Sequence, residues 1–183
     1  MGSIVQPPPV KLFVGVLTSK AEIFDEVESR LVASFGAVDL RSGRFPFDQT
    51  DYYEREMGTP IERQFLAIEP LIAADALAGI KVETNRLEAE LAGGGALERP
   101  VNLDPGYIEQ AKVVLASTKN FYHRIQLRDG IYAEVTLHWE SGAWRPFPWT
   151  FPDFRSGRYF EFFAALRARY RAQLRQSCLV RRT

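Results

Sequence analysis

The chain has 183 residues, 46% of them hydrophobic, which is long enough for one sizeable core. Its 23 basic and 23 acidic side chains cancel, so no overall field draws it to nucleic acid or to an anionic membrane. The single cysteine excludes an intramolecular disulfide, and no apolar run approaches the roughly 18 to 20 residues of a membrane span. We therefore expect a cytoplasmic protein with one domain over residues 1–183, a flexible lead at 1–10 and a basic tail at 176–183. Neither a membrane nor nucleic acid is an expected partner.

Apolar runs bounded by turn residues predict the strands. These runs cover residues 11–17, 37–41, 62–69, 112–118, 122–127 and 131–139. Pro70 should close the third run, because proline cannot continue a central strand. The Asp129-Gly130 pair predicts a tight hairpin between the last two runs, and residues 142–147 should continue or cap that sheet.

Three segments have apolar residues at helical spacing. The first follows Ser19 and Glu22, which have the spacing of a capping box, and it ends before Gly36. The second covers residues 73–92 and ends at a triple glycine, and the third covers residues 157–175. Residues 45–58 are expected to be an edge strand or an ordered loop, residues 101–107 an acidic turn and residues 149–153 an irregular loop.

The order of these elements in the first two thirds of the chain is β-α-β-β-α-β. That order is typical of a ferredoxin-like sandwich, so we expect an α+β fold with this core, a C-terminal hairpin extension and a terminal helix.

Carboxylates gather in the 45–58 segment, at Asp48 and Asp51. If the sheet brings Asp104 and Glu134 to them, two or three converging carboxylates would bind Mg²⁺, which also needs water or phosphate oxygens. The alternative is that Asp48 only holds its own loop through bonds to the backbone.

His123 is the candidate proton carrier, because a neutral imidazole near pH 7 works as acid or base. Lys119 and Arg124 beside it would neutralise the oxygens of an anionic ligand. An extended strand here would point His123 and Arg124 to opposite faces, so a bulge would be needed to bring them together. The alternative is a structural histidine bonded to a neighbouring carboxylate.

Asn102 and Asp104 stand two residues apart before a Pro-Gly pair. An amide and a carboxylate on one face would orient a hydroxylated ligand such as a ribose, or would only stabilise a turn. Aromatic residues beside Pro, Gly or Asp, among them Tyr52 and Trp149, would wall such a site or pack beneath loops.

Several of these segments together resemble a bacterial family of unknown function, domain-of-unknown-function family 4416. The resemblance covers nearly the whole chain and rests on residues 11–17, 45–58, 101–107, 115–124 and 148–153. Members of that family are sometimes labelled GTP-binding proteins. This chain contains neither a G-x-x-x-x-G-K-[S/T] phosphate loop nor an Asn-Lys-x-Asp sequence.

Two functions are compatible with these patterns. In the first, the chain binds a small anionic molecule, phosphorylated or nucleotide-like, in a cleft lined by the 45–57, 102–107 and 119–124 segments and the Trp149 loop, with hydrolase or transferase activity centred on His123. In the second, it is a protein–protein interaction module that uses exposed aromatic residues and the basic C-terminal helix.

Overall fold

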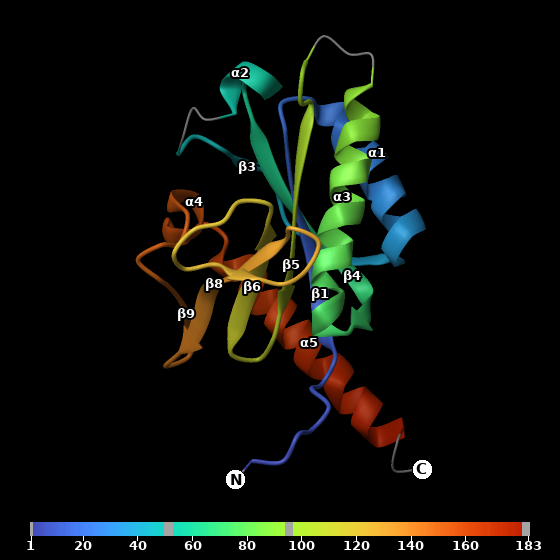
Figure 1. Ribbon diagram of the computed structural model, residues 1–183, viewed down its shortest axis with the longest axis vertical. Coiled ribbons are helices and arrows are strands. Elements are labelled where there is room, and N and C mark those ends of the chain that lie inside the picture. The colour runs from blue at the N-terminus through green and yellow to red at the C-terminus, as the bar shows by residue number, and fades with distance from the viewer. Residues whose placement is uncertain (1, 50–52, 94–96, 181–183) are drawn as a thin grey trace.

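The computed structural model describes residues 2–49, 53–93 and 97–180 and arranges them as one large sheet with helices on both faces (Figure 1). The strands lie in the order β2-β4-β1-β5-β6-β8-β7, while β3 pairs with β4 and β9 with β8. All these pairs are antiparallel. The strands are β1 (Val10–Thr18), β2 (Val38–Arg41), β3 (Phe45–Pro46), β4 (Glu62–Ile72), β5 (Val101–Ile108), β6 (Lys112–Ser117), β7 (Ile125–Gln126), β8 (Tyr132–Glu140) and β9 (Ala143–Pro146).

The described α-helices are α1 (Ala21–Phe35), α2 (Glu54–Met57), α3 (Leu77–Ala92), α4 (Pro152–Arg155) and α5 (Phe160–Val180). A short 3₁₀ turn, Ala74–Ala76, leads into α3. None of these helices combines the length and the apolar composition needed to cross a membrane.

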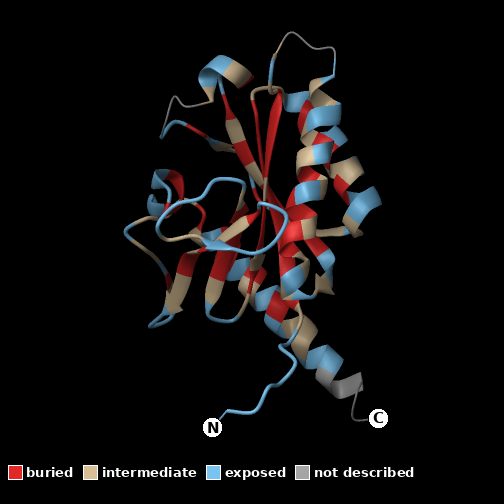
Figure 2. Cartoon of the chain, viewed as in Figure 1, coloured by how far each residue is buried: buried red, intermediate tan, exposed pale blue. Residues whose placement is uncertain are grey.

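The sheet separates two apolar layers, because successive residues of a strand point to opposite faces. In β1, Leu12, Val14 and Val16 pack against α1 and α3, whereas Phe13 faces the side covered by α4 and α5. Figure 1 shows α1 and α3 on one side of the sheet and α5 crossing behind it. The buried residues accordingly lie along the central strands and the inner sides of the helices (Figure 2).

The mixed α/β fold with a large antiparallel sheet confirms the expected fold class at that level. The first strand, the helices at 21–35 and 77–92, and the hairpin after β7 lie where the sequence predicts them. At the hairpin turn, Asp129 and Gly130 have positive φ angles of 56° and 72°, the conformation that an Asp-Gly pair favours.

Several local predictions are wrong, and in three of them a tertiary contact replaces a local signal. The strand expected to end at Pro70 continues to Ile72, because a register shift in the β1–β4 ladder accommodates the proline. The residues expected to form an acidic turn at 101–107 form β5. No capping box forms: Ser19 Oγ instead donates a hydrogen bond of 2.5 Å to the carbonyl oxygen of Met57.

Candidate functional site

The first polar cluster, the His123 cluster, consists of His123, Arg124, Glu134 and Trp149. Its centre is the buried carboxylate of Glu134 on β8, whose side chain is 1% exposed. Oε2 of Glu134 accepts a hydrogen bond of 2.7 Å from Arg124 Nε and lies 3.0 Å from His123 Nε2. The two neighbouring residues reach one oxygen because residues 121–124 form a turn, closed by the Arg124 N–H and the Phe121 carbonyl at 2.9 Å. The predicted strand at 122–127 is therefore reduced to Ile125–Gln126.

A stack of parallel rings fixes the imidazole from one side. The ring centres of His123 and Trp149 are 5.5 Å apart with an angle of 11° between the planes, and those of Trp149 and Phe147 are 4.7 Å apart at 3°. Trp149 Nε1 donates a hydrogen bond of 3.0 Å to the carbonyl oxygen of Val135. His123 Nδ1 is buried and has no hydrogen-bond partner among the described residues. A carboxylate at Nε2 favours the tautomer in which Nδ1 carries a lone pair.

Arg124 also closes the loop in which it lies. Its NH1 donates a hydrogen bond of 2.8 Å to the main-chain oxygen of Lys119, and its guanidinium lies 5.8 Å from the ring centre of Phe151. The Arg124 side chain is 8% exposed. This arginine therefore joins β8, the 119–124 turn and the residue before α4.

The second polar cluster, the Arg63 cluster, consists of Arg63, Asp104, Asp153 and Tyr159. Arg63 NH2 lies 3.3 Å from Asp104 Oδ2, and Arg63 Nε lies 3.3 Å from Asp153 Oδ2. Tyr159 donates a hydrogen bond of 3.2 Å to that same Asp153 oxygen. Burial lowers the pKa of Arg63, but Asp153 and Asp104 outweigh it and hold the pKa above its ordinary value. Two carboxylates already compensate the charge of this buried arginine, so an anionic ligand would find no unpaired charge there.

Both clusters lie on the face of the sheet that α4 and α5 cover. Glu134 pairs with Leu115, Leu115 with Gly106, and Gly106 with Phe13, which faces that side. Asp104 is two residues from Gly106 on the same face. From the strand spacing, the Cα atoms of Glu134 and Asp104 are about 12 Å apart, so the two clusters are neighbours and not one constellation.

A model of the domain of unknown function DUF4416 matches residues 8–170 of the chain, which include both clusters. The chain belongs to the DUF4416 family. Searches of the curated proteins and of the solved structures return no match. Family membership therefore agrees with the resemblance seen in the sequence and adds no reaction to it.

In this DUF4416 chain, the predicted site residues fall into three groups. His123, Arg124, Glu134 and Trp149 meet in one cluster, and Lys119 supplies it with a main-chain oxygen. Asn102 and Asp104 lie on β5, where Asn102 accepts a hydrogen bond of 2.5 Å from Arg99. Asp48 is exposed and pairs with Arg158 at 3.0 Å, and hydrogen bonds from Gln49 and Arg158 lower its pKa. Asp51 and Tyr52 lie outside the described residues.

The expected meeting of Asp48, Asp104 and Glu134 around Mg²⁺ is not observed, since Glu134 binds His123 and Arg124 instead. Within the described ranges, no three His, Cys, Asp or Glu side chains come together in a way that would hold a metal ion. Two open hollows do occur on the surface of the DUF4416 chain. One lies along α1, and the other lies between Pro9, β4 and α5, both away from the two clusters.

The sequence alone missed Arg63 and Asp153. A signal for the first was present: Arg63 precedes Phe65 and Ala67 at strand spacing, so it had to share their buried face. An arginine at an inward position requires buried carboxylates, and Asp104 is its partner on β5. Nothing in the sequence around Asp153 indicates the same partner, because that contact depends on how α4 folds over the sheet.

Proposed function

We propose that the protein is a docking module that binds a protein partner through exposed apolar side chains next to the His123 cluster. We define the ring surface as the exposed apolar residues of the segment between β6 and β8 together with Phe151, the residue before α4, whose ring lies near Arg124. Their exposed fractions are 58% for Phe121, 77% for Tyr122, 73% for Ile125, 42% for Leu127 and 47% for Phe151. Figure 2 shows this segment exposed along most of its length. Clustered exposure of large apolar side chains supports the proposal most directly, because such patches are typical of interaction sites.

The ring surface stands out from the rest of the described exterior. The other exposed large hydrophobic residues are Ile4 and Val5, in the lead before β1, and Val32 and Val82, one on each of α1 and α3. Covering apolar surface gains about 25 cal/mol per Å², and five of the nine described exposed large hydrophobic residues belong to the ring surface.

The ring surface is also held in place before a partner arrives. Arg124 and His123 fix its base to the carboxylate of Glu134, and Trp149 packs against the imidazole. A loop that is already ordered loses little conformational entropy on binding. The neighbouring strand β7 is the last in the sheet order, and no described strand pairs with its outer edge, where a partner's strand could add.

Site-specific cross-linking tests the proposal. The variant Tyr122→p-benzoylphenylalanine places a photoreactive group on the ring surface, and the matched control Arg55→p-benzoylphenylalanine places it at an exposed position of α2. After irradiation in living cells, we expect a discrete protein adduct from position 122 and none from position 55. No adduct at 122, or equal yields at both positions, would reject the docking function.

The second candidate function is binding of a small anionic ligand, phosphorylated or nucleotide-like, beside His123. The buried His123 Nδ1 without a described partner favours it, because Glu134 at Nε2 would leave the lone pair of Nδ1 to a hydrogen-bond donor of the ligand. Arg124 and Lys119 would neutralise the ligand's charge, and the exposed rings of Phe121 and Tyr122 would stack on a base.

A thermal-shift screen with nucleotides and sugar phosphates, with and without Mg²⁺, tests the second candidate. The expected result is a rise in Tm with one of these ligands that disappears in His123→Gln. The Arg55→Gln variant, changed on exposed α2, should keep the rise. A uniform lack of stabilisation across the panel would dismiss the candidate.

We also propose that β5-β1-β4-β2 with α1 and α3 is a ferredoxin-like unit. Support comes from the chain order of these elements and from the antiparallel pairing of the four strands in that order. The strands β6 to β9 then extend this unit beyond β5 and carry the ring surface.

A further inference from the structure

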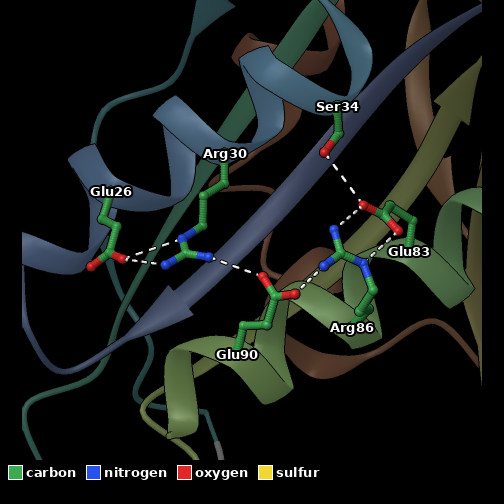
Figure 3. Close-up of polar contacts among 6 residues, drawn as sticks. All are labelled: Glu26, Arg30, Ser34, Glu83, Arg86 and Glu90. Atoms are coloured by element: carbon green, nitrogen blue, oxygen red, sulfur yellow. Dashed lines mark hydrogen bonds and ion pairs between the residues drawn. The ribbon is translucent and has the colours of Figure 1, made fainter.

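The face of α1 and α3 that points away from the sheet is rich in carboxylates. Apart from Lys81 and Glu88, which point inward to β5, the two helices carry six carboxylates and two arginines, a net charge of −4. Arg41 of β2 pairs with one of these carboxylates, Glu28. Arg30 forms ion pairs with Glu26 and Glu90, and Arg86 forms ion pairs with Glu90 and Glu83 (Figure 3). Two arginines therefore share three carboxylates across the two helices. We call this exposed side of the two helices the acidic helix face.

The segment that carries the ring surface has the opposite charge. Between residues 119 and 130 it has Lys119, Arg124 and Arg128 against the carboxylate of Asp129. Arg124 is also paired with the buried Glu134, so the segment together with that carboxylate has a net charge of +1. The chain is neutral as a whole, but its positive and negative side chains gather on different surfaces. Attraction between such surfaces guides association and fixes its orientation.

The acidic helix face also has exposed apolar side chains. Val32 on α1 is 39% exposed and Val82 on α3 is 45% exposed. One of the open hollows lies beside Val32 and is lined by Asp25, Glu28 and Ser29 as well. A ring from another molecule placed against Val32 would therefore lie beside Asp25 and beside Glu28, which is already paired with Arg41.

We infer that the ring surface of one copy docks on the acidic helix face of a second copy, an inference that rests on the docking function proposed above. Apart from Ile4 and Val5 before β1, the exposed large hydrophobic residues of the described chain belong to these two surfaces. The two surfaces are thus complementary in charge, and both have apolar groups to cover.

The position of the two surfaces allows a closed pair. A Cβ atom at Gly79 of α3 would lie 3.1 Å from Arg128 NH2, so the ring-surface loop borders α3. Figure 1 shows this loop passing in front of the sheet toward α3. Because the surfaces adjoin, a twofold axis can place each ring surface on the partner's helix face at the same time. Each copy then contributes both surfaces, which helps to reach the roughly 800 Å² per partner of a stable interface.

Sedimentation and light scattering of the full chain test the inference. We expect a dimer with twice the 20.8 kDa mass of the chain, with a Kd that rises with salt. The ring variant Phe121→Ser/Tyr122→Ser and the helix-face variant Val32→Lys/Val82→Lys should each raise the Kd at least tenfold. All four side chains are exposed, so both variants should fold, which circular dichroism checks. Glu54→Lys on exposed α2 adds the same kind of charge elsewhere and should leave the Kd unchanged.

Mixing the two variants separates this arrangement from other dimers. In a mixed pair, one ring surface and one helix face are both intact and can meet, so native mass spectrometry should find more heterodimer than either homodimer. If rings dock on rings, the helix-face variant will dimerise like the wild type, and the inference is overturned. A monomer at all concentrations also overturns it. The cross-linked adduct at position 122 then decides the docking function separately: an adduct with another protein retains it, and no adduct removes it.

Discussion

At the scale of single residues, the tightest steric requirement lies at Gly106, in the centre of the sheet. A Cβ atom there would stand 2.4 Å from the Val114 carbonyl oxygen and 2.7 Å from Phe13 Cζ. The carbonyl belongs to the paired strand β6, so it cannot move aside without breaking the ladder. Only glycine lets β5 pass between its neighbours at this point.

We therefore expect Gly106→Ala to destabilise the fold by about 3 kcal/mol, the upper range for an overpacked core. Urea unfolding followed by circular dichroism measures the change. The control is Gly43→Ala, because a Cβ atom at Gly43 meets nothing within 4 Å. Equal stabilities of the two variants would contradict the steric argument.

The sequence predicts His123, Arg124 and Glu134 as residues of a ligand or metal site. In the structure they bind one another instead. A carboxylate was the alternative partner of a structural histidine, and Glu134 holds that position. Arg124 reaches the same oxygen through a turn, which no local pattern in residues 121–124 indicates, since their apolar content resembles a strand. Residue types were therefore predictable from the sequence, while their convergence required the tertiary fold.

At the scale of elements, β5 and β6 are paired only from Gly106 onward. Before Gly106, side chains of α3 make hydrogen bonds to β5 in place of a neighbouring strand. The ladder between β5 and β6 covers only residues 106–108 of β5. Further along, the Leu103 N–H donates a hydrogen bond of 2.7 Å to Glu88, and the Leu103 carbonyl accepts one of 2.7 Å from Lys81 Nζ. Buried backbone groups need such partners.

Lys81→Met should cost about 1–3 kcal/mol, because it leaves the Leu103 carbonyl buried without its donor. Amide hydrogen exchange along β5 and urea unfolding measure the effect. Lys20→Met, at a half-buried lysine that caps no helix through its side chain, is the matched control and should change the unfolding free energy little. Unaltered exchange along β5 would show that the lysine bond is dispensable.

The loop that carries the ring surface depends on one carboxylate. In Glu134→Gln, the charge that holds Arg124 and His123 is lost, while the size of the side chain is kept. Hydrogen exchange should increase across residues 119–130 and stay unchanged in β1, because β1 does not contact this carboxylate through any described bond. The control Glu140→Gln alters an exposed carboxylate on the same strand and should affect neither region.

Elements with strong apolar patterns were predictable, and those fixed by distant contacts were not. β1 is buried at every position, so its sequence is apolar on both faces and reads as a central strand. β5 contains Asp104, Pro105 and Gly106, which locally favour a turn. It is a strand because β1 pairs along its whole length and because Pro105, which lacks an N–H, lies where β6 no longer pairs. Local sequence carries no information about either neighbour.

At the scale of the whole molecule, buried tyrosines link the fold to alkaline pH. Burial is the main cause that raises the pKa values of Tyr107, Tyr159 and Tyr170 above the ordinary value. Tyr159, directly before α5, and Tyr170, on α5, lie in the core. They donate hydrogen bonds to Asp153 and to the carbonyl oxygen of Pro9, respectively. Burial of Lys11 lowers the pKa of its amine below the ordinary 10.5. This shift makes the stability of the fold rise with pH between the lowered pKa and 10.5, which is opposite to the effect of the tyrosines.

The sign of this linkage follows from which state releases the proton first. Below about pH 10 the tyrosines are neutral in both states, so their contribution is fully present. Above about pH 10 the unfolded chain ionises while the folded chain keeps its protons, and each such tyrosine removes about 1.4 kcal/mol per pH unit. Stability is therefore lost as pH rises from about 10 toward the raised pKa values.

In Tyr159→Phe the unfolding free energy should fall less steeply above pH 10, although it is lower at pH 7 because the bond to Asp153 is gone. Urea unfolding between pH 7 and 11.5 measures the slope, and Tyr122→Phe, changed at an exposed ring, should retain the slope of the wild type. A Tyr159→Phe slope equal to that of the wild type would mean that this phenol ionises as easily in the fold as in water.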